Sequence, residues 1–166
     1  MFFKAKGVSP LTSVKTILGL SCTALIVLCL SACHHHEGSQ EQLVEYADSF
    51  SIHFYNWHFE QALKYCTPES EMWLRYAASN VHQADIDSLR AKDEDATIEC
   101  DDIHYDDNDS TATIVITAKN FLQMDSIGEV AHRIDEATIS IPMILRHGKW
   151  MVKMVSLPRS EKQSHD

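Results

Sequence analysis

The most distinctive chemical setting in this chain belongs to Cys33, a thiol at the end of a charged and then apolar amino-terminal segment. Three lysines lie within residues 4–15, an apolar run covers residues 17–30, and the small residues Ser31 and Ala32 precede the cysteine. This order is typical of a secretory leader that is cut after a small residue. The residue left at the cut would be Cys33 itself, whose thiol is a potential nucleophile.

Leu30-Ser31-Ala32-Cys33 resembles the lipobox of bacterial lipoproteins. The resemblance implies that a diacylglyceryl group is joined to the Cys33 thiol, that the signal peptide 1–32 is removed, and that the new amino terminus receives a fatty acid such as palmitate. We therefore expect a lipid-anchored protein of the cell envelope, on the periplasmic side of the outer membrane. Its partners would include the membrane itself, reached through this lipid.

The alternative interpretation is a signal anchor that is never removed. The apolar stretch from Thr16 to Leu30 has fifteen residues, whereas a membrane-spanning helix needs roughly 20. Lysines precede this stretch and the next basic residue is Lys64, so the amino terminus stays inside in either case. Both interpretations place the residues after Cys33 on the far side of the membrane.

The charge of the mature chain limits its partners. The leader holds three of the 14 Lys and Arg residues and none of the 24 Asp and Glu residues, which leaves 11 against 24, a formal charge of −13. Such a surface repels phosphate backbones, so no nucleic acid partner is expected. It also repels anionic lipid headgroups, so the lipid on Cys33 must do the anchoring.

Cys66 and Cys100 are the cysteines that remain after the leader, with its Cys22 and Cys29, has been removed and Cys33 has been acylated. In an oxidising compartment such a pair is a candidate disulfide. The alternative is two small buried apolar side chains, since free cysteine is among the most buried residue types. The sequence leaves both open.

A histidine run and an acidic run suggest metal binding, but neither has the ligand pattern of a metal site. His34 to His36 lie in a short polar tether, residues 33–40, without a second ligand motif, and they are better explained as a solvated linker. The acidic run Asp106 to Asp109 lacks the glycine and glutamate positions of a calcium-binding loop and is typical of a turn. No metal is expected. No cofactor is expected either, because none of the glycines of the mature chain begins a phosphate-binding loop.

Helical periodicity comes first along the mature chain. Apolar residues at spacings of 4, 3, 4 and 3 predict a helix over residues 41–56, and a second, short helix is expected over 56–66. Thr67 and Pro68 suit the start of a third helix. Residues 85–92 either continue it or form a separate turn.

Strand periodicity takes over at about residue 95. Four segments alternate apolar and polar residues, with a turn at Asp106–Asp109 and a tight hairpin loop at His147-Gly148. Pro142 places its strand at an edge, or at a bulge, because proline cannot donate to a sheet ladder. The stretch 125–136 is ambiguous between hairpin extension and loop.

Helices followed by an antiparallel sheet indicate an α+β fold, with the helices packed on one face of the sheet. The order, the segment WHFEQALKYCTPES and the segment HGKWMVKMVSL resemble the nuclear transport factor 2-like, or cystatin-like, domains. The resemblance implies an α+β domain over residues 41–158, in which a curved sheet wraps round a long helix. A polar tail, 159–166, follows this domain. It also leaves a homodimer open.

Some enzymes of this fold, similar to ketosteroid isomerase, use an aspartate base and tyrosine or aspartate hydrogen-bond donors in an apolar pocket. The residues here that match those types are Asp102, His104, Tyr46, Tyr55 and Tyr76. Nothing in their spacing singles them out, and no nucleophile motif is present. We therefore expect a non-catalytic domain that binds a small apolar ligand or an envelope protein. The alternative is an isomerase- or hydrolase-like enzyme that uses a pocket between helices and sheet.

Overall fold

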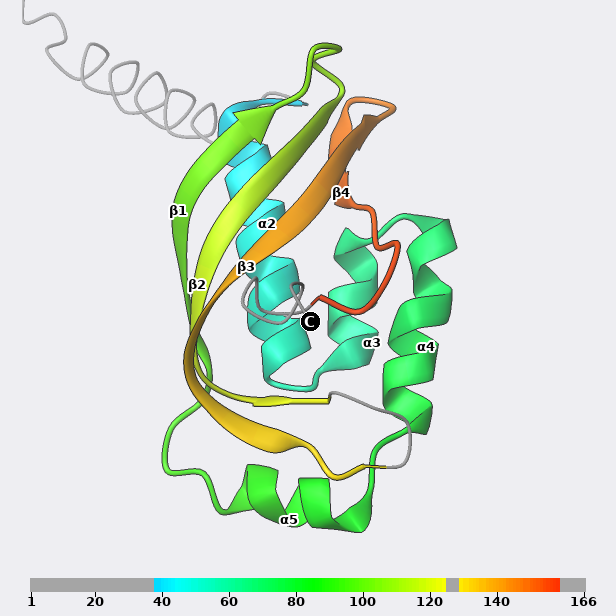
Figure 1. Cartoon of the computed structure of the whole chain (residues 1–166). Coiled ribbons are helices and arrows are strands. Elements are labelled where there is room, and N and C mark those ends of the chain that lie inside the picture. Colours follow the sequence, from blue (N-terminus) through cyan, green and yellow to red (C-terminus); the bar gives the residue numbers. More distant parts are fainter. Residues whose placement is uncertain (1–37, 125–128, 159–166) are drawn as a thin grey trace, which may run out of the picture. The chain divides into compact units, whose positions relative to one another are not determined.

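The computed structural model describes residues 38–124 and 129–158 (Figure 1). The leader, Cys33, most of the tether, residues 125–128 and the tail 159–166 lie outside the described residues. All described helices and strands belong to one of the two units into which the chain divides, His35–Asp166.

The first described helix, α2 (Gln40–Tyr55), confirms the helix predicted from apolar spacing. It begins where the Ser39 hydroxyl accepts a hydrogen bond from the Gln42 amide at 3.2 Å, which satisfies one of the free donors of the first turn. Its apolar face, carried by Leu43, Ala47 and Phe50, is completely buried or nearly so. This face fixes α2 against the sheet.

The second and third predicted helices are present but divided into short segments. They are α3 (Phe59–Ala62), the 3-10 turns η1 (Leu63–Tyr65) and η2 (Pro68–Ser70), and α4 (Glu71–Ser79). Pro68 occupies the first position of η2, as expected, but the Thr67 hydroxyl bonds to the Ser70 hydroxyl at 2.8 Å and caps no amide.

Residues 83–90 form a separate helix, α5 (Gln83–Arg90), which answers the question that the sequence left open. Its position depends on Asp85, whose side chain is fully buried. One carboxylate oxygen accepts from the His82 amide at 2.7 Å and the other from the Ala131 amide at 2.8 Å. A single side chain thus caps α5 and joins it to the start of the third strand.

The four strands form one antiparallel sheet in the order β1-β2-β3-β4. Their bounds are β1 (Thr97–Tyr105), β2 (Thr111–Gln123), β3 (His132–Arg146) and β4 (Lys149–Val152). The predicted turns lie between β1 and β2 and between β3 and β4; in the second, His147 and Gly148 both have positive φ, 52° and 77°, as the favoured two-residue hairpin loop requires.

Pro142 lies in β3, a strand between β2 and β4, at the point where the pairing with β4 has just ended. The last residue of β4, Val152, pairs with Met143, so the ladder with β4 ends next to the proline. The proline carbonyl accepts from the Lys153 amide at 2.9 Å, beyond the end of β4. The missing N–H therefore falls just beyond the last paired residues of β3 and β4, where the sequence led us to expect an edge or a bulge.

The sheet bends near Asn120, which has φ of 55° three residues before the end of β2. Its side-chain amide donates to the Glu94 carbonyl at 2.7 Å, while the pairing with β3 resumes at Phe121 and Ile134. Asparagine tolerates this conformation better than most residues. The bend turns the ends of β2 and β3 towards α5 (Figure 1).

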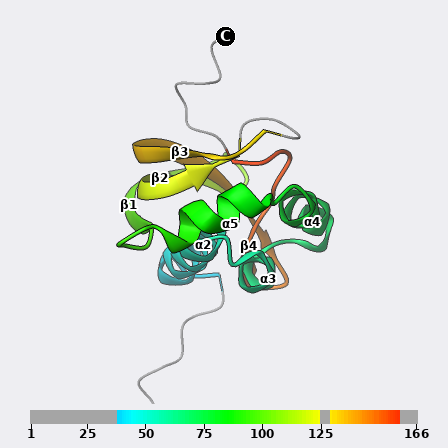
Figure 2. The same ribbon diagram turned by 90° about the horizontal axis from the view of Figure 1, so that it is seen from below.

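The described helices lie on one side of the sheet, as Figure 2 shows. The sequence predicted that a set of sheet residues packs against a set of helix residues, and nearly all of them are buried: Ile114, Ile116, Ile139, Ile141, Trp150, Val152, Leu43, Phe50 and Phe54. Trp73 differs, because it is half-buried at the edge of this core. The α+β architecture is therefore established, with an open four-stranded sheet.

Cys66 and Cys100 are not paired in this structure: the first is a buried free thiol and the second an exposed one. Cys66 lies beside β4 through a bridge to Val152, whereas Cys100 lies on β1 at the opposite edge. Three strand spacings separate those edges, about 14 Å, and a disulfide needs Cα atoms within about 7 Å. The two cysteines belong to separate environments.

Candidate functional site

The polar residues proposed as a catalytic set are not brought together. Asp102 and His104 lie on β1, where Nε2 of the histidine is 3.4 Å from the Asp102 carboxylate and both side chains are 64% exposed. Tyr55 is buried on α2, and Tyr76 is exposed on α4. Tyr46 packs edge-on against Tyr65 with ring centroids 5.4 Å apart. These five residues share no pocket.

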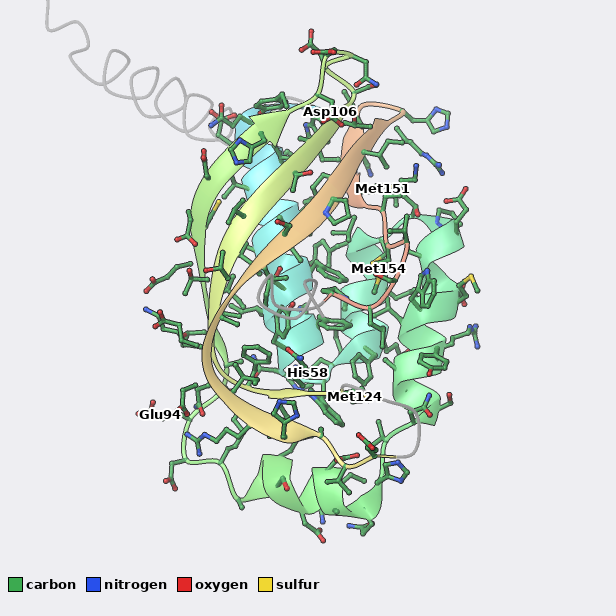
Figure 3. The ribbon with its side chains drawn as sticks, in the orientation of Figure 1. His58, Glu94, Asp106, Met124, Met151 and Met154 are labelled. Atoms are coloured by element: carbon green, nitrogen blue, oxygen red, sulfur yellow. The ribbon has the colours of Figure 1, made fainter. Side chains whose placement is uncertain are left out.

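The described histidines and acids also remain dispersed. The rings of His53 and His58 lie 6.0 Å apart, and Figure 3 shows His58 in the half of the domain away from Asp106. Among residues 38–124 and 129–158, no group of three or more His, Cys, Asp or Glu side chains is placed to hold a metal ion. The acids at 106–109 form the β1–β2 turn, in which Asp106 accepts from the Thr111 hydroxyl at 2.5 Å.

Residues of the described ranges line a cavity near the bend of the sheet, and its volume is about 20 Å³, the size of a single water molecule. Its lining is mostly aromatic and aliphatic: Phe54, Tyr55, Trp57, Phe59, Leu122, Gln123, Met124, Leu157 and Pro158. Met124 lies at the end of β2 beside this region (Figure 3).

Two residues that line this cavity have unfavourable local features, one in its backbone and one in its buried hydroxyl. Trp57 has φ of 61°, unusual for a bulky side chain, and its indole N–H donates to the Leu122 carbonyl at 3.1 Å. The Tyr55 hydroxyl is buried without a hydrogen-bond partner, and burial raises the pKa of Tyr55 well above its usual value. The carboxyl of Asp48, whose pKa is raised by partial burial, does not line the cavity. The cavity thus holds no acid–base pair.

A larger hollow lies outside this core, between α3 and α4. Its volume is about 350 Å³, within the range of small-molecule sites. Its lining combines four apolar and two charged residues of α3, η1 and α4: Phe59, Leu63, Leu74, Ala78, Glu60 and Arg75. We call this hollow the α3–α4 groove.

The spacing of apolar residues in the sequence is compatible with this groove. Phe59 and Leu63 are four residues apart, as are Leu74 and Ala78, a spacing that predicts one helix face for each pair. Leu74 is 2% exposed and forms the floor. Arg75 also lines the groove, and its Nε donates to the Glu71 carboxylate at 2.7 Å. Glu60 is an exposed carboxylate on the facing helix.

No protein-family model, curated protein sequence or solved structure matches this chain. Within the described ranges, no helix is both long and apolar enough to cross a membrane.

Proposed function

We propose that this protein is a lipoprotein of the bacterial cell envelope, anchored through Cys33, whose α+β domain binds a small apolar ligand and performs no catalysis. The anchor is supported by the order of lysines, apolar run, small residues and cysteine at the amino terminus. The lipid would place the domain on the periplasmic side of the outer membrane, within reach of lipids and envelope proteins.

We further propose that the domain is a divergent nuclear transport factor 2-like, or cystatin-like, domain. The support is the arrangement of the long helix α2 against the concave face of a bent antiparallel sheet (Figure 1). In this assignment the cavity that the described residues line near the bend of the sheet is small, about 20 Å³.

The observation that carries the binding function is the α3–α4 groove. A hollow of about 350 Å³ with an apolar floor leaves apolar surface in contact with water, and a ligand that covers it gains free energy from its burial. Leu63 and Phe59 form one wall, and Ala78 stands at the other. A short aliphatic or aromatic ligand fits this chemistry better than a phosphate or sugar.

The alternative of an isomerase- or hydrolase-like enzyme has less support. General acid–base catalysis needs a titrating group within hydrogen-bond reach of a bound substrate. Asp102 and His104 are exposed on β1, and the cavity around Tyr55 has room for one water. The exposure of Asp102 and His104 and the small size of the cavity beside Tyr55 therefore favour a binding module.

Binding of a fluorescent fatty acid to residues 33–166 with Cys33→Ser tests the groove. This form is suitable because the buried core is built from residues between Leu43 and Met154. Leu63→Glu charges the groove and Ala78→Trp fills it, while Ile52→Glu alters an exposed apolar residue outside it. We expect the two groove variants to bind at least tenfold more weakly than Ile52→Glu. Equal affinities in all three would refute the groove as the binding site.

A further inference from the structure

The walls of the α3–α4 groove are held in place by the core of the domain. The ring of Phe59 packs against the rings of Phe54 and Trp57, with centroids 5.7 and 5.9 Å away. Leu63 is half-buried against the core, and Leu74 is 2% exposed. A hollow that is already formed costs a ligand little reorganisation, so its size and its charges decide which ligand it prefers.

The size of the groove suits a short aliphatic chain. Its volume of about 350 Å³ holds on the order of ten water-sized groups at roughly 30 Å³ each, and an unbranched chain of roughly eight carbons is of this size. The segments that line it, α3 with η1 and α4, lie side by side in both views (Figures 1 and 2). A chain of this length fills the groove and leaves its polar head beside the charged residues of the lining.

The two charged residues of the lining differ in their pairing. Arg75 is neutralised on its own helix, because its Nε donates to a Glu71 carboxylate oxygen at 2.7 Å and its Nη2 contacts the same oxygen. Glu60 is exposed, and no side chain of the described residues forms an ion pair with it. Lys64, four residues further along the chain, is not part of the lining. The unpaired charge of the groove is therefore negative.

The charge of the whole chain has the same sign as that of Glu60. Without the leader the formal charge is −13, and such a field attracts cations and repels anions. A ligand with a carboxylate head is repelled both by this field and by Glu60. A ligand with an ammonium head is attracted by both, and its compact charge can approach an exposed carboxylate closely.

We propose that the α3–α4 groove selects cationic amphiphiles, with the aliphatic chain against Leu63 and Leu74 and a primary ammonium head beside Glu60. This inference rests on the proposed binding function and adds the head group of the ligand to it. A fatty acid binds the groove through its chain alone, so an amine of the same length binds more tightly. An exposed ion pair raises an affinity by up to about fivefold, so a head group of opposite charge changes it by about tenfold.

Calorimetric titration at neutral pH with octylamine, octanol and octanoate tests the proposal. The three ligands share a chain and differ in head group, and each is used below the concentration at which it aggregates. The protein is the Cys33→Ser form of residues 33–166. Glu60→Gln removes the unpaired charge of the groove. Glu94→Gln is the matched control, because Glu94 is an exposed carboxylate outside the lining, at the margin of the domain opposite α4 (Figure 3).

We expect the wild-type domain to bind octylamine about tenfold more tightly than octanoate, with octanol between them. Glu60→Gln should weaken octylamine binding by about threefold to fivefold and leave octanol binding unchanged, whereas Glu94→Gln should alter neither. Arg75→Gln should tighten octylamine binding, because it leaves the Glu71 carboxylate without its partner. Added salt should reduce the preference for octylamine, since it screens exposed charges.

Equal affinities for octylamine and octanol, or equal effects of Glu60→Gln and Glu94→Gln, would overturn the preference for a cation and leave the groove as a binding site. Octanoate that binds most tightly, and more weakly to Arg75→Gln, would overturn it in favour of an anionic ligand. Failure of the proposed binding function has a different signature. In that case none of the three ligands binds, or Ala78→Trp, which fills the groove, binds them as tightly as the wild-type domain, and both proposals are overturned.

Discussion

Replacement of Asp85 by alanine should loosen α5 and lower the stability of the whole domain. The side chain is fully buried and its two oxygens accept the amides of His82 and Ala131 at 2.7 and 2.8 Å. Alanine leaves two N–H groups in a poorly solvated site without an acceptor, each at a cost of about 1–3 kcal/mol. We expect a loss of about 3 kcal/mol in the free energy of unfolding, or roughly 10 °C in the midpoint of thermal unfolding for a domain of this size.

Thermal and urea unfolding followed by circular dichroism measure this effect, and hydrogen exchange at Ala131 and along α5 locates it. Asp85→Asn should cost about half as much, because the amide oxygen still accepts one of the two bonds. Asp87→Ala is the control, since Asp87 is exposed and its carboxylate bonds to Gln83 at 2.9 Å in the same helix. If Asp85→Ala and Asp87→Ala destabilise equally, the buried carboxylate does not hold α5 in place.

Two further predictions follow from shifted pKa values. Burial raises the pKa of the Cys66 thiol from 9.0 to about 12, so a thiol reagent at pH 8 should label Cys100 in the folded domain and both residues after unfolding in urea. Because the unfolded thiol ionises first, stability contributed by the neutral Cys66 should be complete below about pH 9 and disappear as the pH rises towards 12; stability that stays constant over this window would contradict the burial. The hydrogen bond from Arg146 lowers the pKa of Glu69 to about 2, so this pair should stabilise the fold above about pH 4.5 and be lost as the pH falls towards 2. Arg146→Gln should return the Glu69 pKa towards 4.5 in an NMR titration, and an unchanged value would show that the ion pair does not form in solution.

Local patterns were sufficient to predict the main elements. The 4-3 spacing of Leu43, Ala47 and Phe50 predicted α2, and the alternation of Ile114 and Ile116 predicted the buried side of β2; both are confirmed. These signals work because one face of each element packs against the core along its whole length. The same logic gave the coarse α+β class.

The deviations arise where neighbours in space decide the outcome. Cys100 continues an alternating pattern, yet it is exposed, because β1 is an edge strand with an irregular register at that point. Asp85 has the sequence character of a surface residue and is buried because two amides bind it. No local pattern predicts that the Ala131 amide, 46 residues away in the sequence, donates a hydrogen bond to this carboxylate.

The candidate site shows the same limit. The tyrosines and Asp102 were named for their chemistry, but a shared pocket depends on packing that periodicity does not describe. The groove between α3 and α4 requires two short segments to lie side by side, so that Leu63 and Ala78 line the same hollow. Their spacing was visible in the sequence, while the pairing of the helices was not.

The measurement that tests the central claim most directly is metabolic labelling of the full-length chain with radioactive palmitate in a bacterial host, combined with membrane fractionation. Our account predicts label and membrane attachment in the wild-type chain and in a Cys100→Ser control, and neither in Cys33→Ser. Palmitate label that persists in Cys33→Ser, or a wild-type chain without label, would contradict it.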